Sequence, residues 1–315
     1  MRKIIILLLA AVILTLPACK NSGQGVKWTE ATKAAAFGAR EIIGVPIIFR
    51  DRMWVIAGTN AADIFNDVWN SSDGIIWKRV TGKAGFGKRS GSGTLVYKNK
   101  MWVISGWNGS RELTDVWNSS DGTAWTQVTG TAEFIPRDGF GCYVYEDRMW
   151  MIGGYCNGEC LNDAWNSNDG ITWTKVAAAT GFSPRMGFGN MVYKNKMWVI
   201  GGANYNKSNF FNDVWNSDDG ITWTKVTGTA DFCDRVEFTS LVYKDKMWVI
   251  GGVSSTGGYL NDVWSSGDGK VWTETTNSAG FSPRWAFAGF VYNDKIWVVA
   301  GFDGTNLLND VWRSP

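Results

Sequence analysis

Tryptophan recurs along this chain at a nearly constant interval, and that regularity limits the folds the chain can adopt. One series lies in segments like MWVIGG at spacings of 48 to 50 residues: Trp54, Trp102, Trp150, Trp198, Trp248 and Trp297. A second series lies in segments like NDVW: Trp69, Trp117, Trp165, Trp215, Trp264 and Trp312. A third follows Asp-Gly turns: Trp77, Trp125, Trp173, Trp223 and Trp272. A period of this length indicates one supersecondary unit repeated six times.

The sixth unit lacks its third tryptophan, and the N-terminus supplies a replacement. The last copy ends soon after Trp312, whereas Val26-Lys27-Trp28-Thr29 has the missing pattern. With Trp28 included, 18 of the 20 tryptophans hold repeat positions. We therefore interpret these 18 as bulky anchors that fill the space between stacked sheets.

Each unit predicts four strands, A to D, represented by GNMVYKNK, KMWVIGG, NDVWNS and ITWTKV. Turns rich in Asn and Asp join A to B, and Asp-Gly, a strong hairpin signal, joins C to D. Four strands in about 50 residues indicate a propeller blade. The sequence thus predicts an all-β, six-bladed β-propeller of four-stranded antiparallel blades, with an N-terminal strand completing the last blade and closing the ring.

The order of a hydrophobic run, Gly-Gly, NDVW and a further tryptophan resembles the kelch repeat, as in the central domain of galactose oxidase. The resemblance covers nearly all of residues 26–315. The turn Ser-x-Asp-Gly-x-x-Trp, as in Ser167 to Trp173, is similar to the Asp box of sialidases but one residue shorter. Asp boxes are structural, so this second resemblance implies no chemistry.

The N-terminus, MRKIIILLLAAVILTLPAC, has the charge and the short apolar run of a secretory signal. Leu16-Pro17-Ala18-Cys19 resembles a bacterial lipobox, which implies cleavage before Cys19 and lipidation of its sulfur. An ordinary secretory signal with an incidental cysteine is the alternative. We expect a signal peptide at 1–18, a lipidated tether at 19–25 and the propeller at 26–315. The expected location is extracytoplasmic and lipid-anchored at the bacterial cell envelope, in the outer membrane if the host has one.

Charge and composition exclude several functions. Removing Arg2 and Lys3 leaves 29 basic residues against 29 acidic ones, which argues against a nucleic-acid binder. The chain has no histidine, so a Ser-His-Asp triad and a copper site like that of galactose oxidase are excluded. Cys156 and Cys160 share one short loop, and we predict a possible disulfide between them rather than a metal site. We predict no cofactor.

The D–A and B–C connections of a propeller open on one face, the loop face; the A–B and C–D turns open on the other, the turn face. Each D–A connection carries one arginine, and together they form the ring arginines: Arg40, Arg89, Arg137, Arg185, Arg235 and Arg284. A phenylalanine precedes each by three residues. Kelch repeats resemble this, with Pro-Arg at the mouth of the channel. The ring arginines either cap carbonyls and pair with neighbouring blades, or form a cationic funnel that binds a carboxylate.

The two tryptophans outside the repeat, Trp107 and Trp285, lie in loops expected on the loop face. An exposed indole there suits sugar stacking or a protein hot spot, whereas loop packing is the alternative. The B–C loops differ between repeats and add further candidates for recognition: Tyr155, Tyr205, Lys207, Asn209 and Tyr259.

Catalysis would fall to carboxylates next to the ring arginines: Glu41, Asp138, Asp234 and Glu237. A carboxylate pair can hydrolyse glycosides, and six-bladed kelch proteins include a sialic-acid mutarotase. Beside arginine, however, an ion pair is the simpler role. The predicted function is therefore a binding or protein-interaction module with an unknown protein partner. The alternatives are a binder of an anionic glycan or small carboxylate, or an enzyme acting on one.

The tether predicts an orientation. It spans at most roughly 25 Å and enters strand D, which starts on the turn face. We expect the turn face to lie near the membrane and the loop face to point away from it.

Overall fold

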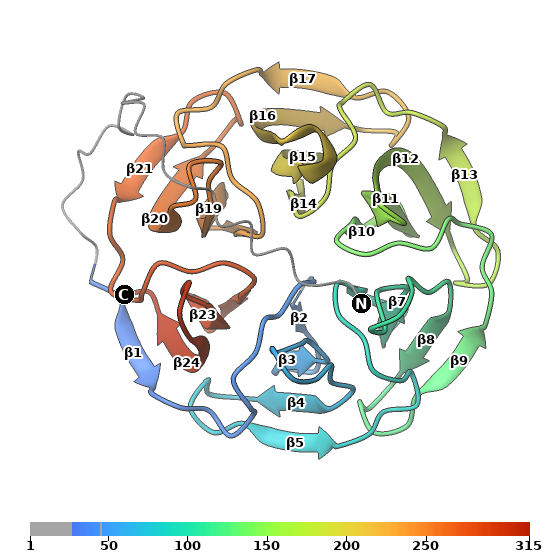
Figure 1. Cartoon of the computed structure of the whole chain (residues 1–315), viewed down its shortest axis with the longest axis horizontal. Helices are drawn as coiled ribbons and strands as arrows, with labels where there is room; N and C mark the ends of the chain where they lie inside the picture. The colour runs from blue at the N-terminus through green and yellow to red at the C-terminus, as the bar shows by residue number, and fades with distance from the viewer. Residues whose placement is uncertain (1–26, 45) are drawn as a thin grey trace.

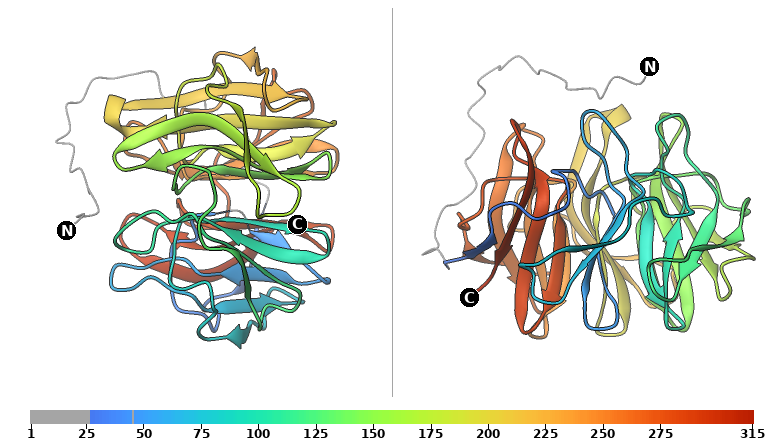
Figure 2. Two further views of the ribbon diagram at one scale, coloured as in Figure 1. Left: turned by 90° about the vertical axis from the view of Figure 1, so that its right-hand side faces the viewer. Right: turned by 90° about the horizontal axis from the view of Figure 1, so that it is seen from below.

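Six four-stranded antiparallel sheets stand around a central axis in the computed structural model of the protein (Figure 1). The structure describes residues 27–44 and 46–315. The predicted six-bladed propeller is confirmed. The predicted signal peptide at 1–18 and tether at 19–25 lie outside the described residues. The side views in Figure 2 show the twisted sheets standing side by side around the axis.

In blades 1 to 5 the strands follow one another outward from the axis in sequence order, whereas in blade 6 the outermost strand is β1 (Thr29–Thr32). Blade 1 contains β2 (Ile47–Ile48), β3 (Met53–Ile56), β4 (Val68–Ser71) and β5 (Lys78–Thr81). Blade 2 contains β6 (Gly93–Tyr97), β7 (Lys100–Ile104), β8 (Val116–Ser119) and β9 (Thr126–Thr129). Blade 3 contains β10 (Gly141–Tyr145), β11 (Arg148–Cys156), β12 (Glu159–Ser167) and β13 (Thr174–Ala177).

The remaining blades follow the same plan. Blade 4 contains β14 (Gly189–Tyr193), β15 (Lys196–Asn204), the 3₁₀ turn η1 (Tyr205–Lys207), β16 (Asn209–Ser217) and β17 (Thr224–Thr227). Blade 5 contains β18 (Thr239–Tyr243), β19 (Lys246–Val253), β20 (Tyr259–Ser266) and β21 (Thr273–Thr276). Blade 6 contains β22 (Ala288–Tyr292), β23 (Lys295–Phe302), β24 (Leu307–Arg313) and β1 (Thr29–Thr32). Among the described residues, no helix is long and apolar enough to cross a membrane.

The N-terminal strand closes the ring. β1 pairs antiparallel with β24, with Thr29 opposite Arg313, and the two lie side by side at the rim (Figure 1). Trp28 packs edge-on against Phe281 with ring centroids 5.1 Å apart. The five other blades contain the same pair between the third-series tryptophan and the repeated phenylalanine, as in Phe182 and Trp223 at 5.3 Å. Trp28 therefore occupies the position that the last repeat lacks.

The hydrophobic core lies between neighbouring blades. Each first-series tryptophan of blades 1 to 4 and 6 covers the Asp-Gly glycine of the following blade; Trp54, for example, covers Gly122. An added Cβ on Gly122 would lie 2.4 Å from the Trp54 ring, and its φ of +81° also favours glycine. The Asp-Gly turn therefore both reverses the chain and receives the neighbour's indole.

A buried Arg–Asp–Trp unit fixes each blade internally, as blade 3 shows. Arg137 makes a two-pronged ion pair with Asp163, at 2.6 Å and 3.0 Å, and also donates to the carbonyls of Ile135 and Gly153. Asp163 accepts a further hydrogen bond from the Trp165 indole at 2.8 Å. Burial tends to raise the pKa of Asp163, but the bonds from Arg137 and Trp165 hold that pKa below its usual value. The unit therefore ties the D–A connection to strands B and C.

We predict that Asp163→Asn destabilises the protein by about 3–5 kcal/mol, because it leaves the Arg137 charge buried without its counterion. Chemical denaturation followed by tryptophan fluorescence measures the loss. Asp218→Asn is the matched control: it breaks an exposed pair with Lys196, and we expect a loss below about 1 kcal/mol. Equal losses in the two variants would contradict a structural role for the buried pair.

Candidate functional site

The ring arginines lie beneath the loop face rather than on it. Their exposed fractions are only 0 to 1%, and each pairs with the aspartate of its own NDVW segment. The pairs are Arg40–Asp67, Arg89–Asp115, Arg137–Asp163, Arg185–Asp213, Arg235–Asp262 and Arg284–Asp310. The aspartates already occupy the guanidinium forks, so none of these six groups is open to a ligand in the structure, and ligand binding by the arginines stays a prediction. The alternative of carbonyl capping is confirmed, although each ion pair lies within one blade rather than between blades.

Trp107 and Trp285 lie on the loop face, both half-buried. The main chain of Trp107 pairs with Ser90, and that of Trp285 pairs with Phe302. The Trp285 ring packs edge-on against Tyr259 with centroids 6.3 Å apart, while its buried indole Nε1 has no hydrogen-bond partner in the structure. Trp107 and Trp285 are thus partly packed against neighbouring loop residues, and ligand contact by either indole stays a prediction.

No disulfide joins Cys156 to Cys160, contrary to the prediction. In the β11–β12 hairpin, Tyr155 lies opposite Cys160 and Cys156 lies opposite Glu159. Because opposed residues share a face and successive residues alternate, the two thiols point to opposite faces of the hairpin. Their shared short loop suggested proximity, but the strand register separates them.

A first ring of residues surrounds the axis on the loop face, and we call it the mouth ring. Its members directly follow the ring arginines, and each pairs through its main chain with the end of strand B or the start of the B–C loop: Glu41, Ser90, Asp138, Met186, Val236 and Trp285. Burial raises the pKa of Glu41. The expected ion pairs between Glu41 or Asp138 and the preceding arginine are not formed, since those arginines bind Asp67 and Asp163.

A second ring lies one residue further along, and we call it the neck ring: Ile42, Gly91, Gly139, Gly187, Glu237 and Ala286. Main-chain hydrogen bonds of 2.7–3.0 Å link its consecutive members from Gly91 around to Ile42. Gly91, Gly139 and Gly187 have φ near +60°, the left-handed region that glycine adopts without strain. The neck ring thus draws the six D–A connections together around the axis.

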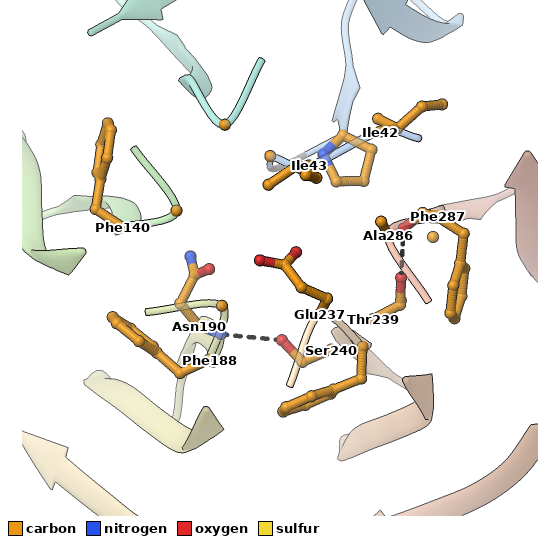
Figure 3. Close-up of a pocket in the computed structure, with 17 residues that line it drawn as sticks. Ile42, Ile43, Phe140, Phe188, Asn190, Glu237, Thr239, Ser240, Ala286 and Phe287 are labelled. Carbon is orange, nitrogen blue, oxygen red and sulfur yellow. Dashed lines mark hydrogen bonds between the residues drawn. The ribbon is translucent and has the colours of Figure 1, made fainter. Parts of the chain in front are cut away.

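Glu237 breaks the glycine pattern of the neck ring. Its φ is +52°, so a long charged side chain occupies a left-handed position. Figure 3 shows the carboxylate projecting toward the axis, between Asn190 and Ile43. Burial first, and then the charges of Glu41 and Asp138, raise the pKa of Glu237 to about 8. Among the described residues the carboxylate has no hydrogen-bond or ion-pair partner.

Below the neck ring the axis opens into a chamber of about 70 Å³, lined by Glu237, Asn190 and Ser240 among others. A wider opening of about 270 Å³ follows toward the turn face, lined by Ile48, Val96, Val144 and Val192 among others. The two spaces share the lining residues Pro46 and Asn190 and therefore lie next to each other along the axis. In the described part of the chain, no group of three or more Cys, Asp or Glu side chains is placed to hold a metal ion.

The sequence marked Glu237 as one of four candidate catalytic carboxylates next to ring arginines, but it did not reveal the chamber. The signal was present in the repeat: the second residue after the ring arginine is Gly in blades 2, 3 and 4 but Glu in blade 5. The other two blades have Ile42 and Ala286 there, so aligning that position would have marked Glu237 as its one charged residue.

The fold and the axial site define a six-bladed β-propeller. A profile of the KLHDC2/KLHL20/DRC7 Kelch-repeats domain matches residues 168–314, from the C–D turn of blade 3 to the end of blade 6. This segment of the chain is therefore similar to the kelch repeats of that domain. No curated protein matches the chain.

We predict that Glu237→Gln changes the pH dependence of stability. The folded pKa is about 8 against an ordinary value of 4.5, so the unfolded state binds fewer protons between these values. The free energy of unfolding of the natural protein should therefore fall as pH rises from about 5 to about 8. Glu237→Gln lacks this loss, so its advantage in Tm should grow across the window and then level off. Calorimetry from pH 5 to 9 measures it, and a constant difference would contradict the assignment.

Proposed function

We propose that this protein is a protein-interaction module at the bacterial cell envelope, with the loop face as its recognition surface. Kelch-repeat propellers are typically protein-interaction modules, and residues 168–314 match the profile of a kelch-repeat domain. The six blades supply a rigid frame on which loops of different length and sequence can be displayed.

The variation of the B–C loops on a constant frame supports this face. Blade 3 extends β11 and β12 into a hairpin that turns at Asn157-Gly158. Blade 4 inserts η1, with Tyr205 41% exposed, and blade 5 has a loop between Val253 and Tyr259. Blades that share nearly every core position therefore differ where a partner would touch them.

The neutralisation of the ring arginines is the single observation that supports the proposed chemistry of the partner. Since all six guanidinium groups are paired inside the blades, the charged members of the mouth ring are carboxylates, Glu41 and Asp138. Tyr259 packs against Trp285, and burial and then the charge of nearby Glu41 raise the pKa of Tyr259. Aromatic rings beside carboxylates suit cationic side chains. The proposed partner therefore presents lysine or arginine to the loop face.

An anionic sugar, a small carboxylate, or an enzyme acting on either loses its support on the same grounds. Each of those functions required guanidinium groups open to the ligand, and the exposed fractions of the ring arginines are 0 to 1%. Carboxylates near the axis would repel such ligands.

We predict that Glu41→Lys weakens partner binding about tenfold or more, because it places a cation where the partner's cation binds. A photocrosslinking residue at Lys207 identifies the partner, and titration of that purified partner measures the effect. Glu146→Lys on the turn face is the matched control, since Lys98, Lys194 and Lys244 hold its repeat position in other blades. Equal affinities for both variants, or crosslinks to the partner only from the turn face, would contradict the proposed surface.

The lipid anchor is part of this proposal. The signal sequence and Cys19 support it, and β1, which follows the tether, starts at the turn-face end of blade 6. We predict that Cys19→Ser moves the protein from the membrane fraction to the soluble fraction and abolishes incorporation of a labelled fatty acid. With lipid on Cys19, the loop face would point away from the membrane. Unchanged fractionation and labelling would contradict lipidation at this residue.

A further inference from the structure

The axial channel below the neck ring is lined in layers of different chemistry. Ile48, Val96, Val144 and Val192 hold one repeat position on the inner strands and line the opening on the turn face. Three of them, Ile48, Val144 and Val192, are 36 to 38% exposed although each lies on the innermost strand of its blade. We call these four residues the apolar ring. Its β-branched side chains line the open passage.

The chamber beyond the apolar ring offers hydrogen-bond acceptors. The Asn190 amide uses its Nδ2 to donate to the Cys142 carbonyl at 2.9 Å, and the Asn190 main-chain N–H donates to the Ser240 hydroxyl at 3.0 Å (Figure 3). Asn190 Oδ1 and both carboxylate oxygens of Glu237 accept no hydrogen bond from another described residue. Polar groups in such a space need partners, and a ligand that donates hydrogen bonds satisfies these acceptors once Glu237 is ionised.

The dimensions match an aliphatic stem with a cationic end. Val192 and Asn190 are two residues apart on β14, so the apolar ring and the acceptor layer are separated by about 7 Å. A four-carbon stem of the lysine type spans such a distance. The chamber of about 70 Å³ has room for an ammonium group and little more. The neck ring, held by its main-chain hydrogen bonds, bounds the chamber on the loop side.

Glutamate at position 237 is energetically unfavourable if that position has only a structural role. Glycine in blades 2, 3 and 4 makes the same turn without left-handed strain and without a desolvated carboxylate. Residues held in sparsely populated backbone regions cluster at binding and active sites, where strain is retained for a function. Nothing in the repeat offsets the cost of Glu237, whereas ligand binding in the chamber would offset it.

We propose that the axial channel binds a primary ammonium group on an aliphatic stem, which enters from the turn face. The ammonium group donates to Glu237 and Asn190, and the stem packs against the apolar ring. This site is separate from the loop face and does not depend on the proposed protein partner. The ligand is either a free alkylamine or the lysine side chain of a peptide, since both present the same chemistry.

Binding should release a proton near neutral pH. The unliganded Glu237 carboxyl is largely protonated at pH 7, and an ammonium group beside it favours the carboxylate. Burial, and then the charges of Glu41 and Asp138, raise the pKa of Glu237. Tyr205 also lies near Glu237, and its own pKa is raised by burial and by the charge of Glu237. The affinity should therefore rise by up to about tenfold per pH unit between pH 6 and 8, while the amine stays charged.

Isothermal titration of the full chain in detergent tests the site with n-butylamine, n-butanol and N-acetyl-lysine methylamide. We expect n-butylamine to bind at least about tenfold more tightly than n-butanol, and Glu237→Gln to remove that preference. Glu159→Gln, which removes an exposed carboxylate of the β11–β12 hairpin, should leave it unchanged. Titration of n-butylamine in buffers of different ionisation enthalpy should report proton release at pH 7.

The remaining arms separate the two sources and test the entrance. Tighter binding of the lysine derivative than of n-butylamine would assign the site to a peptide side chain, and the reverse would assign it to a free amine. Val144→Trp fills the passage at an exposed position and should abolish binding of both. Equal affinity for n-butylamine and n-butanol, or an unchanged affinity in Glu237→Gln, would overturn the site. Normal binding by Val144→Trp would overturn entry from the turn face.

Discussion

The buried ion pair between arginine and aspartate is the interaction on which each blade of this propeller depends. It joins the D–A connection to strand C, and the indole of the NDVW tryptophan completes it. A buried ion pair gives little net stability compared with an apolar pair. It nevertheless requires both partners in place, because removal of either one leaves an uncompensated buried charge. Repeated around the axis, it holds the mouth and neck rings at fixed positions and sets the frame for the variable loops.

The architecture could be predicted because each of its determinants is local and repeated. The spacing of Trp54, Trp102 and their equivalents, the Asp-Gly turns and the placement of Trp28 were enough to define six blades and their closure. The role of the ring arginines could not be settled in the same way. Arg137 and Asp163 are 26 residues apart, and a sequence shows that both recur but not that their side chains meet. The disulfide prediction failed for a related reason, because strand register decides which face Cys156 and Cys160 share.

The exceptions within the repeat carry the functional argument. A regular frame makes each departure from it informative, and Glu237 departs in charge and size while it keeps the left-handed backbone of the glycines. The burial of the ring arginines also reverses the sign of the expected recognition chemistry. A ring of cations in the sequence becomes, after pairing, a loop face whose innermost charges are carboxylates. Net charge along a chain therefore says little about the field at a site until the internal pairs are known.

Closure of the ring by β1 also constrains the order in which the molecule can be assembled. β1 needs β24 as its partner, and the two strands stand at opposite ends of the described chain. As the chain emerges during synthesis, blades 1 to 5 can pair their strands one after another from local hairpins. Blade 6 must wait until Arg313 is available, so Trp28 and β1 remain without their partners until the end. The last step of folding is therefore the joining of the two ends, and it converts an open, edge-exposed stack into a closed ring.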